Sequence, residues 1–121
     1  MKHCLLVDDS DVVRKVARRI LEDFNITSTE AENGQQALDM CRKAMPDVVL
    51  LDWHMPAMGA HEFLSLLRHT PGGDHPVVIY CTTENDPHDI TKARLGGATE
   101  VLMKPFDQES LTRKLQQTRI I

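Results

Sequence analysis

Three acidic residues follow two short apolar segments of this 121-residue chain. Asp8 and Asp9 come directly after the apolar residues 4–7, and Asp52 comes directly after residues 48–51. Continuous runs of leucine and β-branched residues are typical of strands that are buried on both faces of a parallel sheet. The three acids are therefore expected at the carboxyl ends of parallel strands, the edge of an open α/β sheet where binding sites form. Carboxylates that are brought together need a counter-charge, and their hard oxygen atoms suit Mg²⁺.

A threonine and a lysine also end apolar segments. Thr82 follows residues 77–81, and Lys104 follows residues 101–103. A lysine beside carboxylates offsets part of their charge and can hold a phosphoryl oxygen, while a hydroxyl group supplies a directional hydrogen bond. With the three acids, these side chains could bind Mg²⁺ and a phosphoryl group together. Each residue also has a simpler interpretation: an acid as a helix cap or turn residue, the threonine as a plain strand end, and the lysine as a solvated side chain.

Apolar spacing predicts the elements that position these residues. Apolar side chains recur every three or four residues, as on one face of a helix, in a first segment that Ser10 or Asp11 can cap. The apolar residues of this segment are Val13, Val16, Ala17, Ile20, Leu21 and Phe24. Further helices are predicted over residues 33–43, 61–69, 87–95 and 107–117, and strands over residues 4–7, 26–31, 48–52, 77–82 and 101–103.

Strands and helices alternate five times along the chain. Such alternation implies parallel pairing through right-handed crossovers, and hence one central sheet that is covered by helices on both faces. Residues 26–31 are polar at every other position, which is typical of an edge strand. The last two helices are less apolar than the first two, so they are expected to be weakly anchored and able to move or bind partners.

Composition sets limits on the class of protein. The length suits one domain, and the net charge of −4 with a pI near 5.8 argues against a nucleic-acid surface. The basic residues Arg14, Lys15, Arg18 and Arg19 are interpreted as the solvated face of the first helix. No segment approaches the roughly 18 apolar residues of a membrane span, and the N-terminus is neither a signal nor a transit sequence. A cytoplasmic protein without membrane insertion is therefore expected.

The cysteines and histidines show no spacing that indicates a disulfide framework or a metal site. Cys4, Cys41 and Cys81 are odd in number and form no C-x-x-C pair, so they are predicted to be buried, reduced thiols. Five of the six histidines are interpreted as surface or loop residues. They are His54, His61, His69, His75 and His88.

Taken together, the apolar segments and the polar residues that end them resemble the response-regulator receiver domain of bacterial two-component signalling, and in particular its chemotaxis-type single-domain members. The segments that carry the resemblance are residues 5–10, residues 48–56, Thr82 and residues 104–106. They span nearly the whole chain, and their joint match is specific, whereas each alone would be weak. The resemblance implies one receiver domain over residues 1–121 with a flavodoxin-like α/β fold: a doubly wound, five-stranded parallel sheet in the order 2-1-3-4-5 with five helices.

The resemblance also implies a role for each acid. Asp52 would be the nucleophile that accepts a phosphoryl group from the phosphohistidine of a sensor histidine kinase or a histidine phosphotransfer protein. Asp9 and Asp52 would ligate Mg²⁺ directly, together with the backbone carbonyl of His54, and Asp8 would act through a water molecule. The residues agree with this chemistry, because a carboxylate beside Mg²⁺ stays ionised and the metal offsets charge on the transferring group.

The remaining implications concern the switch. Thr82 and Lys104 would contact the acyl phosphate oxygens and report phosphorylation to the rest of the fold. The protein would catalyse its own aspartyl phosphorylation and dephosphorylation without being a conventional enzyme. It would bind a downstream target protein through the fourth helix, fifth strand and fifth helix, from about Pro87 to Gln117, and would be a monomer or a weak dimer.

Other functions stay open at this point. The chain could be a phosphoryl shuttle or phosphate sink without a target of its own, or the isolated receiver of a longer DNA-binding regulator. A stable complex between the phosphorylated form and a target would exclude the shuttle, and the length of the reading frame would decide the second alternative. A phosphoaspartate-forming hydrolase uses similar residues, but 121 residues leave no room for a substrate-covering cap.

The chain departs from the family pattern near the site. The Asp-Gly pair that receivers commonly carry after the Met-Pro turn is replaced by Gly59-Ala60, so the turn into the third helix is expected to differ. Val101 occupies a strand position that commonly holds a switching Tyr or Phe, and a threonine shift therefore cannot be coupled to an aromatic rotamer change there. His54, Thr83 and Glu84 occupy flanking positions that are expected to set the phosphoryl lifetime.

Overall fold

The computed structural model describes residues 2–55, 58–83 and 86–121. In this part of the chain five strands form one parallel sheet in the order β2-β1-β3-β4-β5, which confirms the predicted fold class and strand order. The strands are β1 (His3–Val7), β2 (Thr27–Ala31), β3 (Val48–Asp52), β4 (Val77–Thr82) and β5 (Glu100–Met103). β3 and β4 have the predicted bounds, and β2 lies at an edge of the sheet, as its polar alternation predicted.

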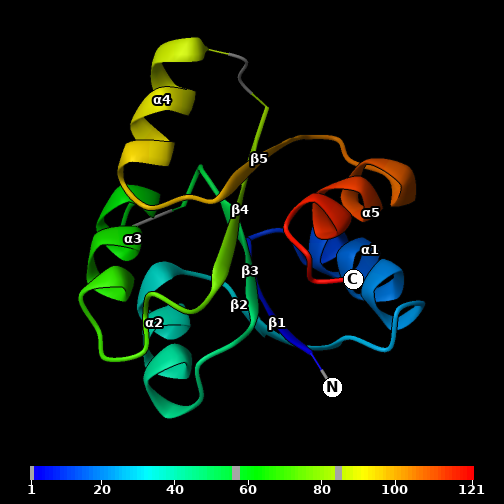
Figure 1. The fold of residues 1–121 in the computed structure, drawn as a ribbon, viewed down its shortest axis with the longest axis horizontal. Coiled ribbons are helices and arrows are strands. Elements are labelled where there is room, and N and C mark those ends of the chain that lie inside the picture. Colours follow the sequence, from blue (N-terminus) through cyan, green and yellow to red (C-terminus); the bar gives the residue numbers. More distant parts are fainter. Residues whose placement is uncertain (1, 56–57, 84–85) are drawn as a thin grey trace.

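Five helices connect the strands and cover both faces of the sheet (Figure 1). They are α1 (Asp11–Glu22), α2 (Gly34–Lys43), α3 (Ala60–Arg68), α4 (Pro87–Leu95) and α5 (Gln108–Gln117). α1 and α5 pack against one face, and α2, α3 and α4 pack against the other. The doubly wound architecture expected from the alternation of strands and helices is therefore observed.

Side chains at the helix starts explain where the helices begin. Ser10 accepts a hydrogen bond from the amide of Val13 at 3.3 Å, and Asn33 caps α2 in the same way. These caps satisfy amide groups that have no partner inside the helix. Gly59 stands at the N-cap of α3 and has no side chain to cap it. Because Ser10 caps α1, the helix begins directly beyond the first two acids of the candidate site.

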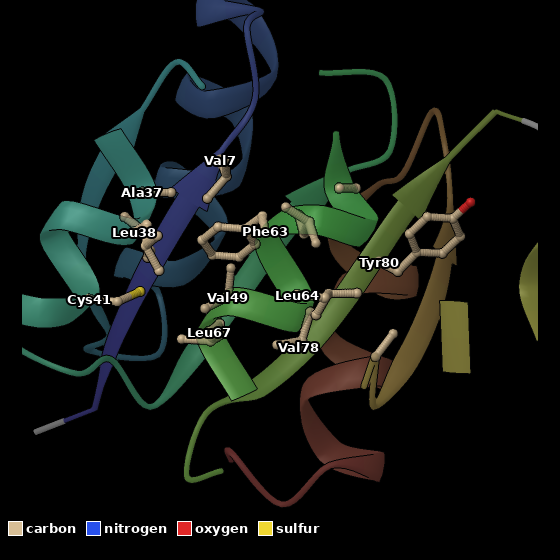
Figure 2. Packing of buried hydrophobic residues seen from close by; sticks show 14 of the residues in the cluster. Val7, Ala37, Leu38, Cys41, Val49, Phe63, Leu64, Leu67, Val78 and Tyr80 are labelled. Carbon is tan, nitrogen blue, oxygen red and sulfur yellow. The ribbon is translucent and has the colours of Figure 1, made fainter. Parts of the chain in front are cut away.

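Each face of the sheet has its own apolar layer. Figure 2 shows the layer on the α2 and α3 side, where Phe63 and Leu64 lie among Val49, Val78 and Leu38. The layer on the other side is formed by buried residues of α1 and α5 together with the opposite faces of the strands. Every residue of β3 is buried, which is why this strand is continuously apolar up to Asp52. Packing on both faces therefore holds the end of β3 in place.

The structure corrects the interpretation of α1 at two positions. Arg14 was expected on a solvated face, but it is only 9% exposed. The reason is that Arg14 lies on the same helical face as the buried residues Ala17 and Leu21, and its charge is paired with Glu30 of β2 at 2.9 Å. Val16, which was expected in the apolar stripe, is 44% exposed.

The three cysteines are buried and free, as predicted. Burial raises the pKa of Cys41 to about 11 and the pKa of Cys81 to about 12. Thiols with such pKa values are protonated and unreactive at neutral pH. Within the described ranges, no helix is long and apolar enough to cross a membrane.

Candidate active site at the carboxyl edge of the sheet

The parallel register brings the ends of four strands to one edge. β1 and β3 are paired residue for residue, so Asp8 and Asp52 leave adjacent strands at the same level. Thr82 is the last residue of β4, and its carbonyl accepts a hydrogen bond from the amide of Lys104 at 2.8 Å, directly after β5. The structure thus brings together five residues that the sequence predicted for one site: Asp8, Asp9, Asp52, Thr82 and Lys104.

The three acids form a compact group of oxygen donors. One carboxylate oxygen from each of Asp8, Asp9 and Asp52 lies within 4.8 Å of the other two. Asp8 and Asp52 are buried, whereas Asp9 is exposed, so the group is accessible from solvent on one side. Carboxylate oxygens are hard ligands that suit Mg²⁺, as they suit Ca²⁺ and Mn²⁺, and they disfavour metals that prefer nitrogen or sulfur ligands. The donor set therefore fits the cation that the sequence predicted.

Lys104 connects two of these acids. Its Nζ donates to Oδ2 of Asp8 at 2.7 Å and to Oδ1 of Asp52 at 3.0 Å. Burial alone would lower the pKa of Lys104, but the hydrogen bonds and charges of the two aspartates outweigh burial, and the pKa is raised. Lys104 therefore stays charged and supplies a counter-charge to two buried carboxylates.

The surroundings of Asp52 disfavour its ionised form. Burial raises the pKa of Asp52, the hydrogen bond from Lys104 acts in the opposite direction, and the negative charge of Asp8 adds to the rise. A carboxylate in this position is stabilised by any further cation that binds beside it. A perturbed pKa at an accessible site marks a candidate functional group.

Backbone groups complete the surroundings of Asp52. The amide of His54 donates to Oδ1 of Asp52 at 3.3 Å, and His54 itself is exposed at the same edge. The role of the His54 carbonyl as a metal ligand stays a prediction. Thr82 is completely buried beside this edge. Pro56 of the Met-Pro turn and Glu84, which was expected to influence phosphoryl lifetime, lie outside the described residues.

Arg14 is a residue near the site that the sequence interpretation did not place there. Its Nη1 donates to the backbone carbonyl of Asp8 at 2.6 Å, while the carboxylate of Asp8 accepts from the amide of Ser10 at 2.9 Å. The sequence did indicate burial at this position, because Arg14 lies three residues before Ala17 and seven before Leu21 on one helical face. The indication was overlooked because the side chain is basic.

Three rings form a cluster next to the site. Trp53, which follows Asp52, packs edge to face on Tyr80 of β4 with ring centroids 4.2 Å apart, and on His61 of α3 with centroids 4.1 Å apart. Figure 2 shows Tyr80 on β4 at one side of the apolar layer. Tyr80 pairs with Val101 in the register of β4 and β5, so an aromatic ring lies on β4 beside the aliphatic residue of β5. His61 was interpreted as a surface residue, but its Nε2 atom is buried.

Comparison with known proteins identifies the class of this fold and site. The family model of the response regulator receiver domain matches residues 4–116. The chain therefore belongs to the response-regulator receiver domain family.

Individual relatives narrow this class. The chain is 36% identical over 110 residues to the chemotaxis protein CheY of Halobacterium salinarum, which covers 91% of this chain and 90% of that protein. It superposes with a TM-score of 0.91 and 33% identity on the chemotaxis response regulator CheY4 of Vibrio cholerae, covering 97% and 98% of the two chains. A receiver domain of a Pseudomonas aeruginosa sensor histidine kinase matches with a TM-score of 0.87 and 25% identity, over 96% and 95% of the two chains. That domain has a magnesium ion coordinated in its active-site cleft. The chain is thus a receiver domain of two-component signalling that is similar to chemotaxis-type regulators.

Proposed function

We propose that this chain is one receiver domain over residues 1–121 that works as a phosphorylation-dependent switch in the cytoplasm. It accepts a phosphoryl group on Asp52 from a sensor histidine kinase or a histidine phosphotransfer protein, and it then changes its binding to a partner protein. The observation that carries the proposal is the shared contact of Lys104 with Asp8 and Asp52 at an edge that is open to solvent beside Asp9. The three free thiols fit a reducing compartment.

The proposed reaction requires a metal ion that this donor set can hold. Asp9 and Asp52 would bind Mg²⁺ directly with the backbone carbonyl of His54, and Asp8 would bind it through water. When bound, Mg²⁺ would offset negative charge on the transferring phosphoryl group. The buried carboxylates of Asp8 and Asp52 support this assignment, because they share one ammonium group and gain from a second cation.

The chain's own residues carry the group transfer. An oxygen of Asp52 attacks the phosphorus of the phosphohistidine, and the new O–P bond forms as the N–P bond breaks. The bonding electron pair stays on the imidazole nitrogen of the donor, which takes up a proton. Lys104 moves from a carboxylate oxygen to a phosphoryl oxygen, and the hydroxyl of Thr82 donates to another. Dephosphorylation is a second reaction of the same site: water attacks the phosphorus, the bond between phosphorus and the Asp52 oxygen breaks, and inorganic phosphate leaves while Asp52 returns to a free carboxylate.

Intact-mass analysis with acetyl phosphate and Mg²⁺ tests this assignment. The wild-type protein is expected to gain the mass of one phosphoryl group, because Asp52 belongs to the acidic group and also accepts a hydrogen bond from Lys104. Asp52→Asn should gain none. Labelling that persists undiminished in Asp52→Asn would show that another residue is the acceptor.

We further propose that the switch is read out over residues 87–117, which comprise α4, β5 and α5. Weak anchoring of α4 and exposed apolar side chains support this surface. α4 is anchored by one buried residue, Ala93. Leu95, the last residue of α4, is 85% exposed, and Met103 of β5 is 38% exposed. Few buried contacts make an element inexpensive to reposition, and exposed apolar side chains favour binding to another protein.

Hydrogen exchange with and without beryllofluoride, an acyl-phosphate mimic, tests the readout. The largest changes outside the site are expected in residues 83–97. Arg68 donates to the carbonyl of Gly97 at 2.7 and 3.2 Å and holds the exit of α4, so the change is expected to be larger at the start of α4 than at Gly97. If α1 or β2 responds while residues 83–97 do not, the proposed output surface is wrong.

A further inference from the structure

Arg14 is a buried cation beside the acidic group that the proposed chemistry does not use. It lines the same pocket as Asp8 and Asp52 and is 9% exposed. Its guanidinium makes two directed contacts: Nη1 donates to the backbone carbonyl of Asp8 at 2.6 Å, and Nε donates to Oε1 of Glu30 at 2.9 Å. A buried arginine that bonds a backbone carbonyl at the site restrains the backbone there.

The carbonyl that Arg14 contacts belongs to the peptide group between Asp8 and Asp9. This peptide group is planar, so a hydrogen bond to its oxygen fixes the orientation of the whole plane. The preceding peptide group is fixed as well, because the amide of Asp8 donates to the carbonyl of Ala31 at 3.1 Å. Together these bonds set the direction in which the backbone projects both carboxylates. Arg14 therefore restrains two of the three acids at once.

Glu30 keeps the charge of Arg14 from opposing a bound cation. One carboxylate oxygen of Glu30 accepts from Arg14, and the other accepts from Nη1 of Arg18 at 2.7 Å. Because opposite charges in contact largely cancel when felt from further away, Arg14 acts on the site mainly as a hydrogen-bond donor. The rigid fork of a guanidinium allows the contacts with Glu30 and with the Asp8 carbonyl at the same time.

We propose that Arg14 is a positioning residue for the metal site, because it holds the Asp8–Asp9 peptide group in the orientation that directs both carboxylates toward a small cation. This inference rests on the proposed function, since the cation is the Mg²⁺ of that site. Mg²⁺ demands near-ideal octahedral geometry, whereas Ca²⁺ tolerates irregular arrangements of ligands. A site that loses its restraint therefore loses affinity for Mg²⁺ more than affinity for Ca²⁺.

Arg18→Met is the matched control for Arg14→Met. Both substitutions remove one ion pair with Glu30 and leave an unbranched apolar side chain, but Arg18 lies one helical turn further along α1, where it contacts Glu22 and Glu30. Isothermal titration calorimetry with Mg²⁺ alone and with Ca²⁺ alone measures the two affinities, and urea denaturation measures the stability of each variant. Arg14→Lys is the second test variant, because lysine keeps the charge but lacks the rigid fork.

Arg14→Met is expected to weaken Mg²⁺ binding by roughly tenfold and to lower the ratio of Mg²⁺ to Ca²⁺ affinity, as loss of an outer-shell partner does at other metal sites. Arg14→Lys should show the same lowered ratio, and it is the deciding variant if Arg14→Met does not fold. Arg18→Met should stay within about twofold of wild type, since its ion pair is partly exposed.

The outcomes separate this inference from the proposed function. The first outcome is that the wild-type protein binds Mg²⁺, that Asp9→Ala does not, and that the Arg14 variants keep the wild-type Mg²⁺ affinity and the wild-type ratio of Mg²⁺ to Ca²⁺ affinity. In that case the role of Arg14 is wrong and the proposed function stands. If Arg14→Met and the control Arg18→Met lose the same amount of Mg²⁺ affinity, the stability of α1 and not the contact with Asp8 is responsible, and the inference is overturned. A wild-type protein that binds no Mg²⁺ overturns both.

Discussion

Asp8 and Asp52 are two buried carboxylates that share the ammonium group of Lys104. Burial, with the added effect of the Asp8 charge, raises the pKa of Asp52 in spite of the opposing hydrogen bond from Lys104. A carboxylate with a raised pKa in the folded protein favours its protonated form. The protonated carboxyl group of Asp52 therefore adds to the free energy of unfolding at low pH. This contribution is lost as the pH rises from about 4 through the raised pKa.

Asp52→Asn is therefore expected to stabilise the protein in the absence of divalent cations. The amide keeps the shape of the side chain and removes the buried charge, while Lys104 keeps Asp8 as its partner. We expect the free energy of unfolding at neutral pH to rise by roughly 1 kcal/mol, the size that is common for a single stabilising substitution. Urea denaturation in the presence of a chelator measures this change, with the exposed Asp39→Asn as control. A less stable Asp52→Asn would mean that the ion pair with Lys104 outweighs the cost of burial.

The residues that the sequence predicted for the site share one property. Asp8, Asp52, Thr82 and Lys104 each follow a run of apolar residues, so a local pattern places each of them at a strand end. Arg14 was not predicted, because its role depends on Glu30, 16 residues away in β2, and on the packing of α1 against that strand. The apolar periodicity of one helix or strand does not show which residues of another element it contacts.

At the level of elements, α3 connects the site to α4 through one ring. His61 of α3 packs on Trp53 on one side, and its Nδ1 lies 3.7 Å from the position that a β-carbon would occupy at Gly96, where α4 ends. Burial lowers the pKa of His61, the charge of Lys92 lowers it further, and Asp89 acts in the opposite direction. Both charged residues belong to α4, so the ionisation of His61 is linked to the position of that helix.

The lowered pKa of His61 predicts how stability depends on pH. As the pH falls below about 6.5, the unfolded chain takes up a proton before the folded protein does, so the free energy of unfolding decreases. His61→Leu removes this contribution and keeps an apolar side chain beside Trp53. Between about pH 7.5 and about pH 5.5 we expect the wild-type protein to lose more stability than His61→Leu.

Urea denaturation at both pH values measures the difference, with His88→Leu as the control. His88 is exposed on α4, so its substitution should leave the wild-type pH dependence unchanged. An equal loss of stability in wild type and His61→Leu would show that other groups cause the pH dependence.

Among the strands, the bounds were predicted best where burial dictates the pattern. β3 and β4 are buried along almost their whole length, and their continuous apolar runs gave the observed bounds. The ends of β5 and β2 were predicted less well. β5 begins at Glu100, which pairs with Ile79, and no local signal distinguishes this charged residue from a loop residue. Ile26 is buried but precedes β2, because the strand begins where pairing with His3 of β1 begins.

At the scale of the whole molecule, one sheet is shared by two apolar layers. Cys4 and Cys81 lie in the layer beneath α1 and α5, and Cys41 lies in the layer beneath α2 and α3. Each layer is built on the opposite faces of the same strands, so neither layer can come apart without exposing part of the sheet that supports the other. A chain of this size is expected to unfold in one cooperative step.

The three thiols test this expectation directly, because one or two of them report on each layer. Burial raises the pKa of all three, so the folded protein is expected to resist a thiol reagent at neutral pH. A short pulse of reagent at the midpoint of urea denaturation should give two populations in an intact-mass spectrum, unmodified and triply modified. Reagent added in full denaturant serves as the control for complete labelling. A population modified only at Cys41 would show that the α2 layer opens by itself, and the two layers would then be separate cooperative units.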